Sequence, residues 1–183
     1  MTAKKEKKSV APITSGVYLL FGEIDSEKIL ECCGWIITEN SSENPPDVLN
    51  LVINSPGGSL TDAFALISIM QGSRIPIRTV GIGEVASAGL LILMSGTNGL
   101  RTIDKTAEIM SHHFSAGSTG TYHELQNISK QYSAVDARIV NHYKKCTKLT
   151  EKEIRERLIP THDVYLTAKE AVKLGLADTI GGL

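Results

Sequence analysis

Ser87 is a residue whose type and surroundings could support nucleophilic chemistry. It lies between two alanines in the segment EVASAGLLILMSG, residues 84–96, where small residues give way to an apolar run. At the start of a helix, its hydroxyl would lie near free backbone amides and the positive end of the helix dipole. The same place suits an ordinary N-cap serine. The segment alone therefore leaves two interpretations, a helix cap and a nucleophile.

A serine nucleophile needs partners, and the sequence offers candidates for each. A general base must accept its proton, a third group must orient that base, and amide donors must stabilise an oxyanion. The candidates are, in chain order, Gly57 and Gly58 after an upstream strand, His112 and His113 at the end of a downstream strand, and Asp163 before a capped helix. Neighbouring strand residues face opposite ways, so only one histidine of the pair can point at the serine. Alternation by itself does not say which one.

Two known motifs overlap the serine segment. GIGEVA, residues 81–86, fits the G-x-G-x-x-A fingerprint of dinucleotide binding, and Asp104 follows at about the 20-residue distance that the fingerprint requires. The motif is mid-chain, and SPGG and the histidine pair would then have no role, so dinucleotide binding is disfavoured. Val85 occupies the first glycine position of G-x-S-x-G, which also disfavours the α/β-hydrolase elbow.

Metal ligation is another chemistry to weigh, since the chain has five histidines. They are His112, His113, His123, His142 and His162. No pair has the H-E-x-x-H spacing, and no acidic cluster completes a ligand set. We therefore expect neither a metal nor a cofactor bound by this chain.

Composition sets further bounds on the class of protein. The 183 residues suffice for one domain with a sizeable core. A net charge of −1 and an aromatic content of 5 % argue against a nucleic-acid partner. Cys32, Cys33 and Cys146 form neither a CxxC pair nor an even set, which favours a reducing, cytoplasmic setting. No apolar run reaches the roughly 18 residues of a membrane span, so no membrane partner is expected.

Periodicity and turn signals predict the elements that must position these residues. They are a strand and turn within 47–58, a helix at 60–71, strands at 75–83 and 106–114, a short helix beginning near Ser87, and a helix at 122–146. Gly72 is expected to stop the first helix. Strands that alternate with helices indicate an α/β fold.

The helix expected at 122–146 has an unusually long apolar stripe that needs a partner surface. The stripe consists of Leu125, Ile128, Tyr132, Val135, Ile139, Tyr143 and Cys146. Beyond it, TEKE at 150–153 and TAKE at 167–170 each predict a capping box at a helix start. Gly175 is expected to end the second of these helices.

Four motifs in register resemble the proteolytic subunit of the Clp protease. They are INSPGG (53–58), ASAG (86–89), IMSHH (109–113) and HDVYLTAKEAVKLGLADTI (162–180), and the resemblance extends over residues 17–180. It implies an α/β spiral of ββα units, an architecture shared with the crotonases, and a protruding strand–helix handle at 114–146. Residues 16–183 would form one peptidase domain. The basic residues 1–15 would form a flexible segment at an axial pore.

The resemblance also implies roles for individual residues. Ser87 would be the nucleophile, His112 the general base, and Asp163 the residue that orients the imidazole. The backbone amides of Gly58 and Ala88 would form the oxyanion hole. The implied activity is that of a serine endopeptidase that cuts unfolded polypeptides into short peptides.

The implied partners are further copies of the chain and an ATP-driven unfoldase. The family forms two stacked heptameric rings around a chamber, with the handle as the ring-to-ring contact. An AAA+ Clp ATPase would dock on the ring, consume the ATP and supply the unfolded chain. Substrate would bind as an extended strand beside the nucleophile.

The chain departs from the family at two places. His113 and Phe114 follow His112, where the family usually has glutamine and proline. The segment SAGSTGTYHE at 115–124 also lacks the family's usual glycine-glutamine sequence. These departures bear on the depth and side-chain preference of the peptide-binding groove and not on the hydrolytic chemistry. Three alternatives stay open at this point: a non-catalytic ring subunit, a crotonase-type acyl-CoA enzyme, and, more remotely, a dinucleotide-binding protein.

Overall fold

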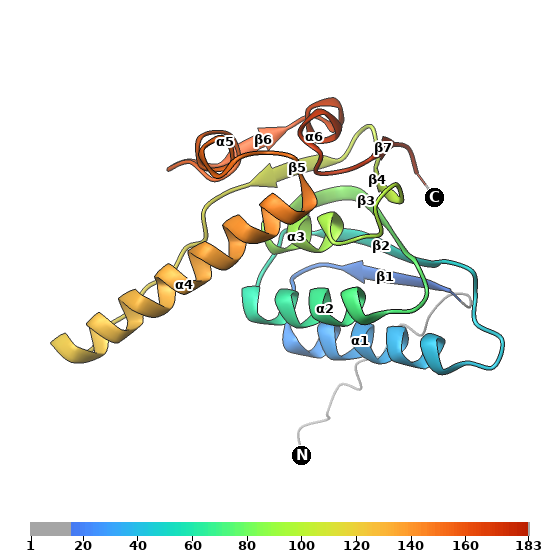
Figure 1. Ribbon diagram of the computed structural model, residues 1–183, viewed down its shortest axis with the longest axis horizontal. Coiled ribbons are helices and arrows are strands. Elements are labelled where there is room, and N and C mark those ends of the chain that lie inside the picture. Colours follow the sequence, from blue (N-terminus) through green and yellow to red (C-terminus); the bar gives the residue numbers. More distant parts are fainter. Residues whose placement is uncertain (1–15, 183) are drawn as a thin grey trace, which may run out of the picture.

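The computed structural model describes residues 16–182, and these residues contain a seven-stranded sheet (Figure 1). Its strands are β1 (Val17–Phe21), β2 (Leu49–Ser55), β3 (Ile77–Ala86), β4 (Arg101–Ile103), β5 (Glu108–Ser111), β6 (Val164–Leu166) and β7 (Thr179–Ile180). They are ordered β1-β2-β3-β4-β7, and β5 pairs with β3 off this path. All these pairs are parallel, whereas β6 adds to β5 in the antiparallel sense. The expected α/β fold class is confirmed.

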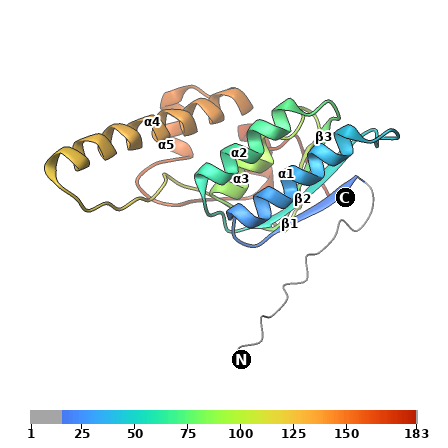
Figure 2. The same ribbon diagram turned by 90° about the horizontal axis from the view of Figure 1, so that it is seen from below.

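Helices connect these strands and cover the sheet. They are α1 (Ser26–Ser41), α2 (Leu60–Gly72), α3 (Ala88–Met94), α4 (Tyr122–Cys146), α5 (Glu151–Arg157) and α6 (Ala168–Leu174). Figures 1 and 2 show α1 and α2 side by side under β1 and β2, while α4 extends away from the body. No helix in the described part of the chain is long and apolar enough to cross a membrane.

The strand expected within 47–58 is β2, which lies between β1 and β3. Leu49, Leu51 and Ile53 are completely buried, and the intervening Val52 is buried as well. A parallel sheet covered on both faces requires such a nearly continuous apolar run. Asn50 and Asn54 are the partly exposed positions of this strand.

The predicted boundaries agree with the structure best at helix starts. The helix expected at 122–146 is α4. The boxes at Thr150 and Thr167 are present, each closed by a glutamate three residues later, and Gly175 ends α6 in the left-handed conformation at φ 79°. Hydrogen bonds from the cap threonine lower the pKa of Glu153 and Glu170, because they stabilise the ionised carboxylates.

Three predicted boundaries were wrong. Gly72 is the last residue of α2 rather than its stop, and Ser73 caps the helix in an extended conformation. The strand expected at 75–83 begins at Ile77 and continues to Ala86, because it pairs with β5 as well as β2. The strand expected at 106–114 is shortened to β5, since a turn stabilised by the Asp104 carboxylate precedes it and the chain leaves the sheet after Ser111.

Sequence reasoning did not anticipate α1. Asp25 caps it by accepting a hydrogen bond from the backbone amide of Lys28, and one face is buried. The buried residues are Ile29, Cys32, Trp35 and Ile36, a helical spacing that could have been recognised. The short strands β1, β4, β6 and β7 were not assigned either. The expected segment 1–15 lies outside the described residues.

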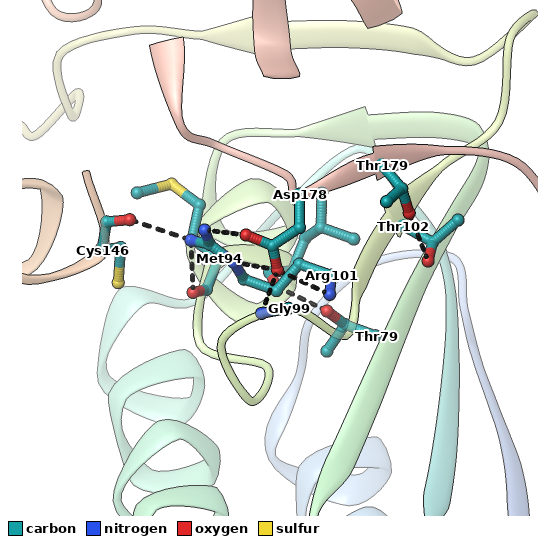
Figure 3. Close-up of polar contacts among 9 residues, drawn as sticks. Thr79, Met94, Gly99, Arg101, Thr102, Cys146, Asp178 and Thr179 are labelled. Atoms are coloured by element: carbon teal, nitrogen blue, oxygen red, sulfur yellow. Dashed lines mark hydrogen bonds and ion pairs between the residues drawn. The ribbon is translucent and has the colours of Figure 1, made fainter. Parts of the chain in front are cut away.

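Arg101 joins the ends of two helices to the C-terminal segment (Figure 3). Its guanidinium donates to the Cys146 carbonyl at the end of α4 and to the Met94 carbonyl at the end of α3. It also makes a two-pronged contact with Asp178, 2.6 Å at the shorter prong. A cation at a helix C-terminus satisfies free carbonyls and complements the dipole. This cluster holds α3 and α4 together at the end away from Ser87.

Candidate active site

Three strand ends meet at one edge of the sheet. Ser87 directly follows β3, His112 directly follows β5, and Asp163 directly precedes β6. β3 and β5 are parallel, with Ala86 opposite Met110, so their carboxyl ends coincide. β5 and β6 are antiparallel, with Ser111 opposite Val164, so β6 begins where β5 ends. The pairing therefore brings together three residues that are far apart in the chain.

The backbone at Ser87 makes a sharp turn from β3 into α3. Its dihedrals are φ 51° and ψ −121°, and it is the one non-glycine residue with positive φ among residues 16–182. Such a conformation costs on the order of 1–3 kcal/mol and persists only where the surroundings enforce it. Its amide donates to the Met110 carbonyl at 3.0 Å, which fixes the turn to β5.

The interpretation of Ser87 as a helix cap is wrong for its side chain. Ser87 occupies the N-cap position of α3, but its hydroxyl makes no capping hydrogen bond. Instead, the Oγ atom lies 2.8 Å from Nε2 of His112. The unusual backbone conformation therefore accompanies a hydroxyl that faces a possible general base.

His112 lies between the serine and a carboxylate. Its second ring nitrogen, Nδ1, is 3.4 Å from Oδ1 of Asp163. This distance exceeds the roughly 3.2 Å limit of an ordinary N–H···O hydrogen bond. Asp163 is half-exposed, whereas the His112 side chain is mostly covered. The structure thus brings Ser87, His112 and Asp163 into one row, with a loose contact at the carboxylate end.

His113 faces away from Ser87 and belongs to a separate polar cluster. Its Nε2 donates to the Asp136 carboxylate at 2.9 Å, and its ring stacks on Phe114. Asp136 also accepts two hydrogen bonds from Arg155, and these bonds lower the pKa of its carboxyl group although partial burial opposes them. Of the two histidines, His112 is therefore the one that contacts Ser87, a distinction that alternation left open.

The glycine turn after β2 lies against the Ser87 elbow. A Cβ atom on Gly57 would approach Cβ of Ser87 to 2.6 Å and the amide nitrogen of Ala88 to 3.1 Å. Gly57 also has φ 102°, a region that side chains disfavour. Only glycine allows the two backbones to come this close. Ala88 is the first residue of α3, so its amide has no acceptor within the helix.

Gly58 presents its amide in a defined direction. In its bridge with Ile24, the hydrogen bonds to Ile24 use the Gly57 carbonyl and the Ser59 amide. The amide of Gly58 itself consequently points away from Ile24. Its φ is 140°, and an added Cβ would lie 2.4 Å from the Ile24 carbonyl oxygen. The expected oxyanion donors, Gly58 and Ala88, thus sit on adjoining turns beside the serine.

Two hollows flank the Ser87–His112 pair. A small apolar recess is lined by Leu60, Ser87, Leu91, His112, Phe114, Ile139 and Tyr143. On the Asp163 side lies a larger cavity of about 630 Å³, whose wall includes His112, Arg155, Pro160, His162 and Asp163. Sequence reasoning missed most of these lining residues. They come from different elements and share no spacing signal.

The GIGEVA motif does not form a phosphate-binding turn. Residues 81–86 are all within β3, so no loop separates this strand from Ser87. An added Cβ would meet the Ile103 side chain at Gly81 and the Asn54 side chain at Gly83, so both glycines serve packing. The Asp104 carboxylate accepts from Thr106 within its own turn. The structure thus gives this motif no phosphate-binding geometry, in agreement with the expectation that disfavoured dinucleotide binding.

A family model supplies an independent finding. The model described as Clp protease matches residues 13–182, which is nearly the whole chain. The matched region contains the strand ends that carry Ser87, His112 and Asp163 and the glycine turn at 57–58.

Proposed function

The chain belongs to the Clp protease family, and on that premise we propose that it is a serine endopeptidase with Ser87, His112 and Asp163 as its catalytic triad. The observation that supports this best is the 2.8 Å contact between Ser87 Oγ and His112 Nε2 at a strained strand-to-helix elbow. A hydroxyl held beside an imidazole, with the ring's other nitrogen facing a carboxylate, is the arrangement that serine acylation requires.

In the proposed mechanism, His112 accepts the Ser87 proton as Oγ attacks the carbonyl carbon of the scissile bond. The tetrahedral oxyanion accepts hydrogen bonds from the amides of Gly58 and Ala88, and each such donor contributes roughly 10²–10³ to kcat. Imidazolium then protonates the leaving amine. Water, activated by the same imidazole, hydrolyses the acyl-enzyme.

Asp163 has the supporting role in this scheme. Its carboxylate would accept a hydrogen bond from Nδ1–H of His112, keep Nε2 free to act as base, and stabilise the imidazolium. The 3.4 Å separation is longer than that bond requires. Catalytic hydrogen bonds of this kind tighten when substrate closes the site. We therefore expect the His112–Asp163 contact to shorten in the substrate complex.

The proposed substrate is an unfolded polypeptide. An extended chain would lie along the sheet edge at Ser87, with strand-like hydrogen bonds. Family resemblance supports two stacked heptameric rings and an AAA+ Clp ATPase that delivers the chain. The three free thiols, Cys32, Cys33 and Cys146, favour a cytoplasmic location.

Labelling with a fluorophosphonate probe tests the proposal directly. Wild-type protein should be labelled at Ser87 and should cleave short fluorogenic peptides. Ser87→Ala should abolish both reactions while keeping the same elution volume on size exclusion. Cleavage that persists in Ser87→Ala would contradict the proposal. An assembled wild-type protein that neither labels nor cleaves would instead indicate a non-catalytic ring subunit.

A further inference from the structure

A buried hydroxyl cluster lies directly behind the His112 position. Ser111, which is completely buried, precedes His112 at the end of β5. Its Oγ lies 2.7 Å from the hydroxyl of Tyr143 and 2.6 Å from the carbonyl oxygen of Leu158. Tyr143 is also buried, in the inner half of α4. One hydroxyl therefore connects three segments that are distant in the chain.

The direction of each hydrogen bond in this cluster can be assigned. The Leu158 carbonyl can only accept, so the Ser111 hydroxyl donates its single proton there. Tyr143 must then donate to Ser111. Burial raises the pKa of Tyr143 to about 12, so its hydroxyl keeps this proton throughout the neutral range. The chain of donors runs from α4 through β5 to the segment after α5.

Each segment in the cluster leads to a residue of the candidate site. Ser111 is bonded to His112, and the segment that starts at Leu158 ends at Asp163. Next to Tyr143 on α4, His142 donates from Nε2 to the Leu91 carbonyl in α3, the helix that begins after Ser87. Two consecutive residues of α4 thus contact β5 and α3, and Ser111 extends this connection to the segment that leads to Asp163.

We propose that Tyr143 is a positioning residue that fixes His112 relative to Ser87 through its hydrogen bond to Ser111. The inference rests on the proposed function. A phenylalanine would fill the same volume in this core, so packing alone gives no reason for the hydroxyl. Buried hydroxyls are tolerated when they are satisfied, and their bonds then have fixed directions. The direction matters here because Ser111 is the last β5 residue before the chain leaves the sheet.

Tyr143→Phe removes this hydroxyl and keeps the ring. We expect kcat for peptide cleavage and the rate of fluorophosphonate labelling to fall together by about tenfold, since small misplacements of a base are costly. KM should stay within about twofold, because the substitution leaves the sheet edge proposed for the substrate unchanged. Tyr18→Phe is the matched control: Tyr18 is also a buried tyrosine, but it lies in β1 and its ring contacts Trp35 of α1. The control should retain the wild-type rates.

A double-mutant cycle separates positioning from general core damage. If Tyr143 acts through Ser111, then Ser111→Ala with Tyr143→Phe should be no slower than the more impaired single variant. Thermal melting and elution volume should show folded, assembled protein for Tyr143→Phe at the assay temperature. Wild-type rates in Tyr143→Phe, additive losses in the double variant, or a rate loss equal to the loss of folded protein would each overturn the inference. Failure of the wild type itself to label would count against the proposed triad instead.

Discussion

At Ser87, backbone conformation and side-chain role are linked. A typical N-cap serine has extended backbone dihedrals and turns its oxygen toward an amide of the first helical turn. With φ 51° and ψ −121°, Ser87 turns its Oγ toward His112 instead. The first amide of α3 thereby stays free for another acceptor. The strained backbone at Ser87 thus has two effects: it directs Oγ toward His112, and it leaves the Ala88 amide without a side-chain cap.

Substituting each member of the histidine pair tests the proposed base. His112→Ala should lower kcat by about 10⁶-fold, the order of magnitude expected for loss of a triad histidine. His113→Ala should stay within about threefold of wild type, because its ring bonds Asp136 and not Ser87. Initial rates of peptide cleavage and of Ser87 labelling provide the measurement. The reverse order of losses would assign the base to His113.

Gly58 offers a second test at the same site. Gly58→Ala should lower kcat and reduce the free energy of unfolding by about 1–3 kcal/mol, because an added Cβ meets the Ile24 carbonyl oxygen and disfavours φ 140°. Gly34→Ala is the control: its Cβ would meet nothing within 4 Å, and alanine favours the α1 helix. Urea unfolding and peptide cleavage measure both. A neutral Gly58→Ala would mean that the turn can relax and that the amide is not held in place.

Among the secondary-structure elements, the inner half of α4 contacts both β5 and α3, which adjoin His112 and Ser87. It packs against α3 and β5 with Ile139, His142 and Tyr143, and Arg101 binds its C-terminal carbonyl at Cys146. This region places a titratable side chain in the core. Burial lowers the pKa of His142, because the charged imidazolium would lose its hydration.

Stability should therefore depend on pH through His142. A depressed folded-state pKa means that the unfolded chain binds more protons, so stability is present above the ordinary histidine pKa of about 6.5 and is lost as pH falls below it. His142→Gln, which can still donate to the Leu91 carbonyl, should reduce the slope between pH 7 and 5. Urea unfolding followed by fluorescence of the single tryptophan, Trp35, measures this.

His123→Gln is the control for this experiment. His123 lies at the exposed start of the same helix. Its substitution should leave the pH slope of unfolding as in the wild type. An unchanged slope in His142→Gln would show that other groups cause the acid sensitivity.

At the scale of the whole molecule, the outer half of α4 has an apolar face that no other part of the described chain covers. The apolar stripe expected on this helix is buried at Ile139 and Tyr143, but Leu125 near the other end is exposed within the chain. Figure 1 shows this half projecting from the body. The domain's own core leaves it uncovered, which fits the proposed ring-to-ring contact through the handle.

Leu125→Glu should separate the proposed double ring into single rings. A charge placed in an apolar contact is left without a partner, so association weakens. Light scattering coupled to size exclusion should show half the wild-type mass. Lys130→Glu, an exposed charge reversal on the opposite side of the same helix, should keep the full mass. An unchanged mass for Leu125→Glu would place the contact elsewhere.

Much of this architecture could be predicted from the chain, because its signals are local. The spacing of apolar residues predicted α2, α4 and the β2 strand, and the threonine–glutamate pairs predicted two helix starts. Four sequence motifs in register indicated the family to which the chain belongs. The alternation of elements indicated the α/β class.

Long-range pairing was needed for the rest. Which histidine meets Ser87 depends on how β5 leaves the sheet, and the proximity of Asp163 depends on the antiparallel pairing of β6. The hydroxyl cluster at Ser111 joins residues from β5, α4 and the segment after α5, with no common period. Sequence periodicity reports which face of an element is buried, whereas contacts between elements depend on how they pack in three dimensions.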